Sequence, residues 1–247
     1  MTEDEVRTDI LAEFRRERRL GSALTPDALE LSDDGVLTLA GEVGSVATKK
    51  RALAIAAARP EVRAVVDRLR VTPAARMTDD EILKRLQRLY LPEAFFQGFA
   101  FRAAAPGDTS AEPEFRVLRE GSDRASGRIE IEVRDGVVIP NGEVPGLVSR
   151  RLAGVMAWWA PGVRDVVDGL EATPPEEDAP IRIEEAVRVV LDREPYVDAG
   201  QIRVGVRLNT VRLIGLVQGE AERDMAEADA WCVIGVNDVI NEIEVAG

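Results

Sequence analysis

Apolar and polar residues follow one pattern that occurs three times along this chain. Each occurrence holds a short alternating stretch, a glycine, and then a longer stretch with apolar residues at helical spacing. The three glycines are Gly41, Gly142 and Gly215. Counted from each glycine, alanine stands at positions +11 and +15, valine at +21 and +24, and leucine or isoleucine at +28. Because no gap is needed in any copy, the pattern indicates a triplication of one structural unit.

The spacing within each copy predicts a strand, a helix and a second strand. Alternation over residues 34–43, 135–144 and 209–217 predicts the first strand, which the glycine is expected to end. In two copies this strand follows Asp-Gly, which predicts a type I′ turn with positive φ at both central residues. The two alanines are i and i+4 neighbours on one helix face, so the helix is expected to lie close to a sheet. The valines after the helix predict the strand that returns.

A further helix and strand precede each hairpin. Thr2-x-x-Glu5 and Thr78-x-x-Glu81 are capping boxes that predict helix starts, and residues 183–191 have helical spacing in the third copy. Strands are predicted at residues 28–31, 128–133 and 201–206. The predicted fold class is α+β, with three tandem α-β-β-α-β modules, each a three-stranded mixed sheet covered by two helices. The predicted domains are residues 1–72, 77–172 and 181–247.

Three segments depart from the repeat. Residues 92–127 form a long insertion in the second copy, within which residues 106–113 are predicted to be a mobile loop. Residues 173–180 are rich in proline and acid and are predicted to be a semi-stiff extended spacer. Pro140 lies in a predicted strand and has no backbone N–H, so a sheet edge or a bulge is expected there.

Composition excludes several classes of function. The chain has no histidine, which removes Ser-His-Asp and Cys-His catalysis and the usual zinc ligand sets, and its single cysteine allows no intrachain disulfide. We therefore expect no enzyme activity, no catalytic residues, no metal site and no cofactor, with a monovalent cation as the one candidate ligand of that kind. The net charge is −13, of which −9 falls in residues 173–247, and this argues against nucleic acid as a partner.

The ends and the hydropathy of the chain bear on its location. No apolar run is long enough to span a bilayer, so no transmembrane segment is expected. Residues 1–5 are acidic and lack the basic and apolar regions of a secretory signal, which predicts a cytoplasmic protein.

The repeated motif resembles that of a known family. The residues that carry the resemblance are Asp34-Gly35 with Gly41-x-Val43 and Val65-Val66-Asp67-x-Leu69, Asp135-Gly136 with Gly142-x-Val144 and Val166-Val167-Asp168-x-Leu170, and Gly215-x-Val217 with Val239-Ile240-Asn241-x-Ile243. They resemble the BON domain, named for bacterial osmotic-shock and nodulation proteins. The resemblance covers about four-fifths of the chain and implies a non-enzymatic module that binds phospholipid or other envelope surfaces. It also implies an alternative, because one cytoplasmic member paired with a LysM domain binds potassium.

Basic residues at helix starts are the candidate anion-binding or lipid-binding groups. A helix N-terminus with basic side chains can hold a phosphate, although charge runs are more often solvated helix faces. The densest basic run, in the first helix, is a second candidate, and its long side chains can instead cover apolar surface. The candidates are Lys49, Lys50, Arg51, Arg150, Arg151, Arg15 and Arg16.

Aromatic residues supply the other candidates. The insertion holds Phe95, Phe96, Phe99 and Phe101, which either form a docking patch for a protein or membrane or fill an extra core. Trp158, Trp159 and Trp231 are predicted to pack in the core or between copies.

The sequence leaves two functions open. The first is a scaffold that contacts phospholipid or a protein partner through the basic helix starts or the insertion. The second is a sensor in which turn and strand-end carbonyls bind potassium or another cation. The oligomeric state does not follow from the sequence.

Overall fold

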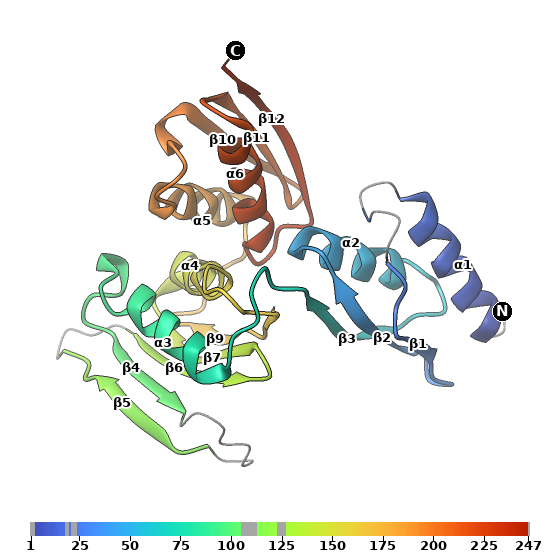
Figure 1. The fold of residues 1–247 in the computed structure, drawn as a ribbon, viewed down its shortest axis with the longest axis horizontal. Helices are drawn as coiled ribbons and strands as arrows, with labels where there is room; N and C mark the ends of the chain where they lie inside the picture. Colours follow the sequence, from blue (N-terminus) through green and yellow to red (C-terminus); the bar gives the residue numbers. More distant parts are fainter. Residues whose placement is uncertain (1–2, 18–19, 21–23, 105–112, 123–126, 247) are drawn as a thin grey trace. The chain divides into compact units, whose positions relative to one another are not determined.

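The computed structural model describes residues 3–17, 20, 24–104, 113–122 and 127–246. The predicted capping threonine at position 2 and most of the predicted loop 106–113 lie outside these residues. Figure 1 shows the helices and strands, which confirm an α+β fold built from α-β-β-α-β modules. Residues Met1–Thr72 form one compact unit and Pro73–Gly247 form another.

The first module has the predicted order of elements. Its first two strands are antiparallel, and its second and third strands are parallel. The helix between the parallel strands is the crossover that this pairing requires. The elements are α1 (Glu3–Arg16), β1 (Ala28–Leu31), β2 (Val36–Val43), α2 (Val46–Ala57) and β3 (Ala64–Val71).

The second and third modules repeat this topology. The second consists of α3 (Asp79–Tyr90), β6 (Arg128–Arg134), β7 (Val137–Val144), α4 (Gly146–Trp158), β8 (Asp165–Val166) and β9 (Gly169–Ala172). The third consists of α5 (Pro180–Arg193), the 3₁₀ turn η3 (Ala199–Gln201), β10 (Ile202–Arg207), β11 (Thr210–Val217), α6 (Glu220–Cys232) and β12 (Asp238–Val245).

The helix contacts predicted from the alanines are confirmed. All six alanines at positions +11 and +15 are fully buried on α2, α4 and α6. The capping box at the start of α3 is also present, because Thr78 and Glu81 exchange hydrogen bonds between side chain and backbone. Local sequence therefore determines where α3 begins and which face the helices α2, α4 and α6 bury.

The repeated glycine does not end its strand, contrary to the prediction. Each glycine lies inside β2, β7 or β11, and the strand continues for two more residues. The reason for glycine is the close approach of the neighbouring strand. A Cβ at Gly142 would lie 2.2 Å from the carbonyl oxygen of Arg128, and a Cβ at Gly215 would lie 2.2 Å from that of Gln201.

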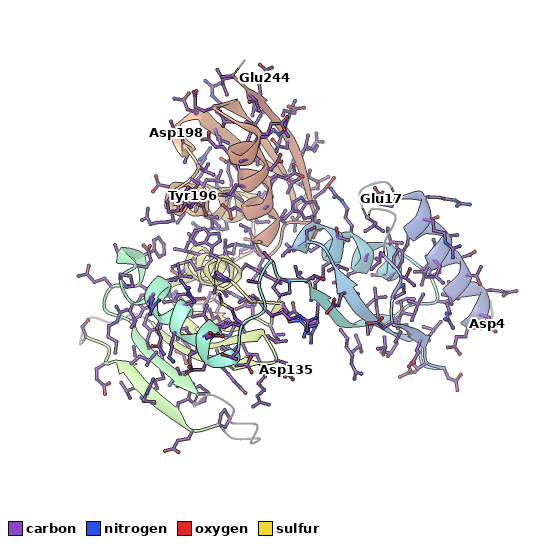
Figure 2. The ribbon with its side chains drawn as sticks, in the orientation of Figure 1. Asp4, Glu17, Asp135, Tyr196, Asp198 and Glu244 are labelled. Carbon is purple, nitrogen blue, oxygen red and sulfur yellow. The ribbon has the colours of Figure 1, made fainter. Side chains whose placement is uncertain are left out.

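The type I′ turn predicted from Asp-Gly is present in the second copy and absent from the first. Asp135 and Gly136 both have positive φ, as a type I′ turn requires, and Figure 2 labels Asp135 at this turn. In the first copy only Gly35 has positive φ, so its loop is longer and of another type. In the third copy Leu208 and Asn209 both adopt positive φ without an Asp-Gly pair. Asparagine tolerates this conformation, and pairing of β10 with β11 fixes the turn.

Pro140 lies neither at a sheet edge nor in a bulge. It stands in β7, between β6 on one side and the third strand of the module on the other. The third strand is divided there: β8 pairs with residues 137–138 of β7, and β9 pairs with residues 141–144. The interruption accommodates a residue that has no N–H to donate.

The insertion in the second module adds secondary structure to the sheet. After the 3₁₀ turn η2 (Ala94–Phe96), strand β4 (Ala100–Ala104) pairs parallel with β6, and β5 (Phe115–Arg119) pairs antiparallel with β4. The sheet of the second module therefore has two more strands beyond β6, as Figure 1 shows. The sequence pattern predicted no strand within the insertion, and two parts of it extend the sheet.

The second and third modules pack together through their helices. Helix α4 contacts both α5 and α6, and α5 contacts α6 (Figure 1). The segment between the two modules does not hold them apart as a spacer would, contrary to the prediction. Its carboxylates bond to α4, because Glu176 accepts a hydrogen bond from the N–H of Leu147 and Asp178 binds Arg151.

Candidate functional site

The basic residue at position +8 of the first copy is committed to an internal ion pair. The Lys49 ammonium lies 2.9 Å from a carboxylate oxygen of Asp67 and donates a hydrogen bond of 2.8 Å to the carbonyl of Leu69. Lys49 is buried. The other oxygen of Asp67 accepts a hydrogen bond from the N–H of Leu69. The pair therefore ties the first turn of α2 to strand β3 inside the module.

The second copy repeats this arrangement. The Arg150 guanidinium is 2.5 Å from Asp168, and Asp168 accepts a hydrogen bond from the N–H of Leu170. In the third copy Arg223 and Asn241 stand at the same two positions. Asn241 still accepts a hydrogen bond from the backbone two residues on, but Arg223 turns to Asp224 instead. The aligned sequence copies show the two paired positions, +8 and +26, as Lys with Asp in the first copy and Arg with Asp in the second.

Arg151 joins the second module to the third. Its side chain is 1% exposed, and it donates to the carbonyl of Ile234, 2.8 Å away, and to Asp178, 2.6 Å away. A guanidinium at this depth is stabilised only by such partners, because removing a charge from water is costly. Arg151 is therefore a structural residue of the interface between α4 and the third module.

The start of α4 also has an internal anion. Glu176 accepts the hydrogen bond of the Leu147 N–H at 2.9 Å, which satisfies one of the free donors of the first helical turn. This is the chemistry that a helix N-terminus offers to a phosphate. In this chain a carboxylate from the segment between the modules occupies the position.

The remaining basic candidates lie elsewhere. Lys50 and Arg51 are half-buried on α2, and both take part in interactions within the chain. Arg15 and Arg16 are exposed near the end of α1, where Arg16 lies 3.7 Å from Glu13. Of the seven candidates, Lys49, Arg150 and Arg151 are held by carboxylates of the chain.

The phenylalanines of the insertion form a core. Phe96, Phe99 and Phe101 are buried, and Phe95 is half-buried. Phe96 contacts all three of the others, and Tyr90 contacts Phe96 and Phe101, with ring centroids 5.4 to 6.2 Å apart. Of the two interpretations that the sequence left open, burial supports the extra core.

Arg119 closes this core from strand β5. Its guanidinium donates hydrogen bonds to the carbonyls of Leu91, Phe96 and Phe99 and lies over the ring of Phe101, 4.8 Å from the centroid. One side chain thus satisfies three carbonyls of the irregular segment. The sequence carries no signal for the role of Arg119, because this residue follows a segment with no recognisable pattern.

One tryptophan connects the helices of the second and third modules. Trp231 is buried, and the indole N–H of Trp159 on α4 donates a hydrogen bond of 2.8 Å to Asp229 on α6. Burial raises the pKa of Asp229 to about 7, while the Trp159 bond acts to lower it and the negative charge of Glu194 raises it further. The second carboxylate oxygen of Asp229 is buried without a hydrogen-bond partner. The prediction of inter-copy packing is confirmed for Trp159.

The open face of the third sheet carries apolar side chains. Ile214, Leu216 and Ile240 are 42%, 49% and 41% exposed on β11 and β12, whereas the alternate residues of these strands are buried under α5 and α6. An ion pair of 2.6 Å between Arg212 and Glu242 lies among them. Position +25 is an exposed apolar residue in all three copies, as Val66, Val167 and Ile240.

Two kinds of feature are absent from the described residues. Within residues 3–17, 20, 24–104, 113–122 and 127–246, no group of three or more Cys, Asp or Glu side chains is placed to hold a metal ion. Over the same part of the chain, no helix is both long enough and apolar enough to cross a membrane.

Comparison with known proteins gives one family and a weak structural similarity. The family model described as the BON domain matches residues 2–73, 116–174 and 182–247, and the gap before the second match contains α3 and β4. No curated protein matches the chain. Two solved chains of CdsD, a structural protein of the type III secretion system of Chlamydia trachomatis, have a TM-score of 0.25. One is its C-terminal domain, with 12% identity and 100% of both chains covered. The other has 13% identity, with 98% of this chain and 92% of that chain covered.

Proposed function

Because this chain belongs to the BON domain family, with three tandem copies, we propose that it is a non-catalytic scaffold that binds protein partners through the open faces of its sheets. The observation that carries the proposal is the exposed apolar residue at position +25 of every module, which is Val66 on β3, Val167 between β8 and β9, and Ile240 on β12. Helices cover one face of each sheet, and an open face that exposes aliphatic side chains is suited to an apolar contact.

The third module offers the most developed of these faces. Ile240 pairs with Arg212, Ile214 with Glu242 and Leu216 with Glu244, so aliphatic and charged side chains alternate across this face. Such a face offers a partner both apolar contact and charged groups. Lipid binding through the helix starts has less support, because Lys49, Arg150 and Arg151 already bind carboxylates of the same chain.

Site-specific photo-crosslinking in the native host tests the proposal. A benzophenone amino acid replaces Ile240 or Ile214, and in the matched control it replaces Glu220, which is exposed at the start of α6. We expect a discrete protein adduct from the two sheet positions and none from Glu220. Vesicles containing phosphatidylglycerol are tested in parallel by co-sedimentation. Adducts at none of the sheet positions, together with co-sedimentation that fades with salt, would instead favour a lipid surface.

A further inference from the structure

Strand β6, the first strand of the repeat unit in the second module, has an added strand along its outer edge. Strand β4 pairs with β6 in parallel, with Phe101 opposite Ile129 and Arg102 opposite Glu130. The added strand is therefore held by backbone hydrogen bonds along an edge that would otherwise be open.

Two side-chain contacts fix the added strand in place. Phe101 is fully buried and contacts Tyr90 at the end of α3, so it fills the space between this helix and β6. On the other face of the sheet Arg102 lies 3.5 Å from Glu130. The edge of β6 is therefore recognised by an aromatic residue, Phe101, followed by a residue whose charge is opposite to that of Glu130.

Strand β10 of the third module is the counterpart of β6. Ile202 stands opposite Gly215 as Ile129 stands opposite Gly142, so Arg203 occupies the position of Glu130. In the described residues no strand pairs with the outer edge of β10. The carbonyl of Val204 faces that edge, since the Arg188 guanidinium reaches it from α5 at 3.4 Å.

A groove lies along this edge in place of an added strand. It has a volume of about 390 Å³ between α5 and β10, and Leu191, Ile202 and Val204 line it. Leu191 is the last apolar residue of the α5 stripe, as Tyr90 is in α3. Figure 2 labels Tyr196 and Asp198 on the connection from α5 to β10, and Tyr196 is 75% exposed.

We propose that the β10 edge binds an extended segment of a partner protein, which adds to the sheet in parallel as β4 does. The segment places an aromatic side chain in the groove opposite Ile202 and an acidic side chain opposite Arg203. The sign of the charge is inverted relative to the second module, because Arg203 replaces Glu130. The inference rests on the proposed protein-binding function and gives it a second surface with a stated partner chemistry.

A peptide that copies β4 tests the inference on the full chain. The probe is a fluorescein-labelled peptide with the sequence of residues 97–104 carrying Arg102→Glu, and the control is the same peptide with the natural arginine. We expect saturable binding by fluorescence polarisation, about tenfold tighter for the acidic peptide. The variant Arg203→Glu changes an exposed side chain, so it should fold, and it should reverse the preference between the two peptides.

Hydrogen exchange locates the bound peptide. Amides of β10 should gain protection, while those of β12, the opposite edge of the sheet, should not. Binding of neither peptide, binding indifferent to the charge swap, or protection elsewhere would overturn the inference. A dimer in light scattering that Arg203→Glu dissociates would also overturn it, by assigning the edge to a second copy of the chain. Photo-crosslinks at positions 214 and 240 without peptide binding would remove the β10 site and leave the proposed function standing.

Discussion

The buried carboxylate of Asp229 should make the packing of the second and third modules depend on pH. Asp229 is 4% exposed between α6 and α4, and burial raises its pKa from 3.8 to about 7. Between pH 3.8 and about pH 7, Asp229 therefore keeps a proton in the folded state that it has lost in the unfolded chain. Since the folded state binds more protons in that range, the free energy of unfolding falls as pH rises from about 4 to about 7.

The size of the effect follows from the pKa difference. At about 1.4 kcal/mol per unit, the difference of about three units corresponds to about 4 kcal/mol in total. About 2.5 kcal/mol of this is lost between pH 5 and pH 8, because the unfolded carboxyl is already ionised at pH 5. The variant Asp229→Asn keeps an acceptor for the Trp159 N–H but buries an amide N–H₂ without an acceptor, which costs about 2 kcal/mol.

The variant should thus match the natural chain near pH 5 and exceed it by about 2 kcal/mol at pH 8. The assay is urea unfolding followed by tryptophan fluorescence at several pH values. All three tryptophans lie in the Pro73–Gly247 unit, so the signal reports on this unit alone. Glu244→Gln, at an exposed position labelled in Figure 2, is the control and should leave the pH dependence unchanged. Equal pH dependence in Asp229→Asn and the natural chain would show that Asp229 is not the group responsible.

Three further substitutions test the packing of the modules. Arg119→Met removes hydrogen bonds to three carbonyls and should cost about 3 kcal/mol in urea unfolding, whereas Arg116→Met, exposed on the same strand, should cost less than about 0.5 kcal/mol. Gly215→Ala places a Cβ 2.2 Å from a backbone oxygen and should lower the free energy of unfolding by about 3 kcal/mol. Gly205→Ala, whose Cβ would have nothing within 4 Å, should not lower it. Equal effects of the two substitutions would contradict the close-approach explanation. Lys49→Met leaves its aspartate partner unpaired and should speed hydrogen exchange in β3, and unchanged exchange would show that the pair contributes little.

The repeated module and most of its internal packing could be predicted from the amino-acid sequence. The spacing of glycine, alanine and valine predicted the order of helices and strands, and the alanine columns predicted the buried helix faces. These features depend on residues close together in the chain, whose periodicity directly reflects which side of a helix or strand is buried. The same reasoning predicted the capping box of α3 and left packing between copies as one of two roles for Trp159.

The roles of the charged candidates depend on partners that the folded chain brings together. Arg151 bonds to Ile234, 83 residues away, and Trp159 to Asp229, 70 residues away, and no local pattern encodes such partners. The basic helix starts resembled anion sites because the sequence shows a charge without its counter-charge. Likewise, the role of Pro140 and the addition of β4 to β6 depend on which strand lies alongside, and strand pairing is a property of the folded sheet. Local periodicity fixes elements, whereas the free energy of burying charges and closing sheet edges depends on neighbours that only the fold brings together.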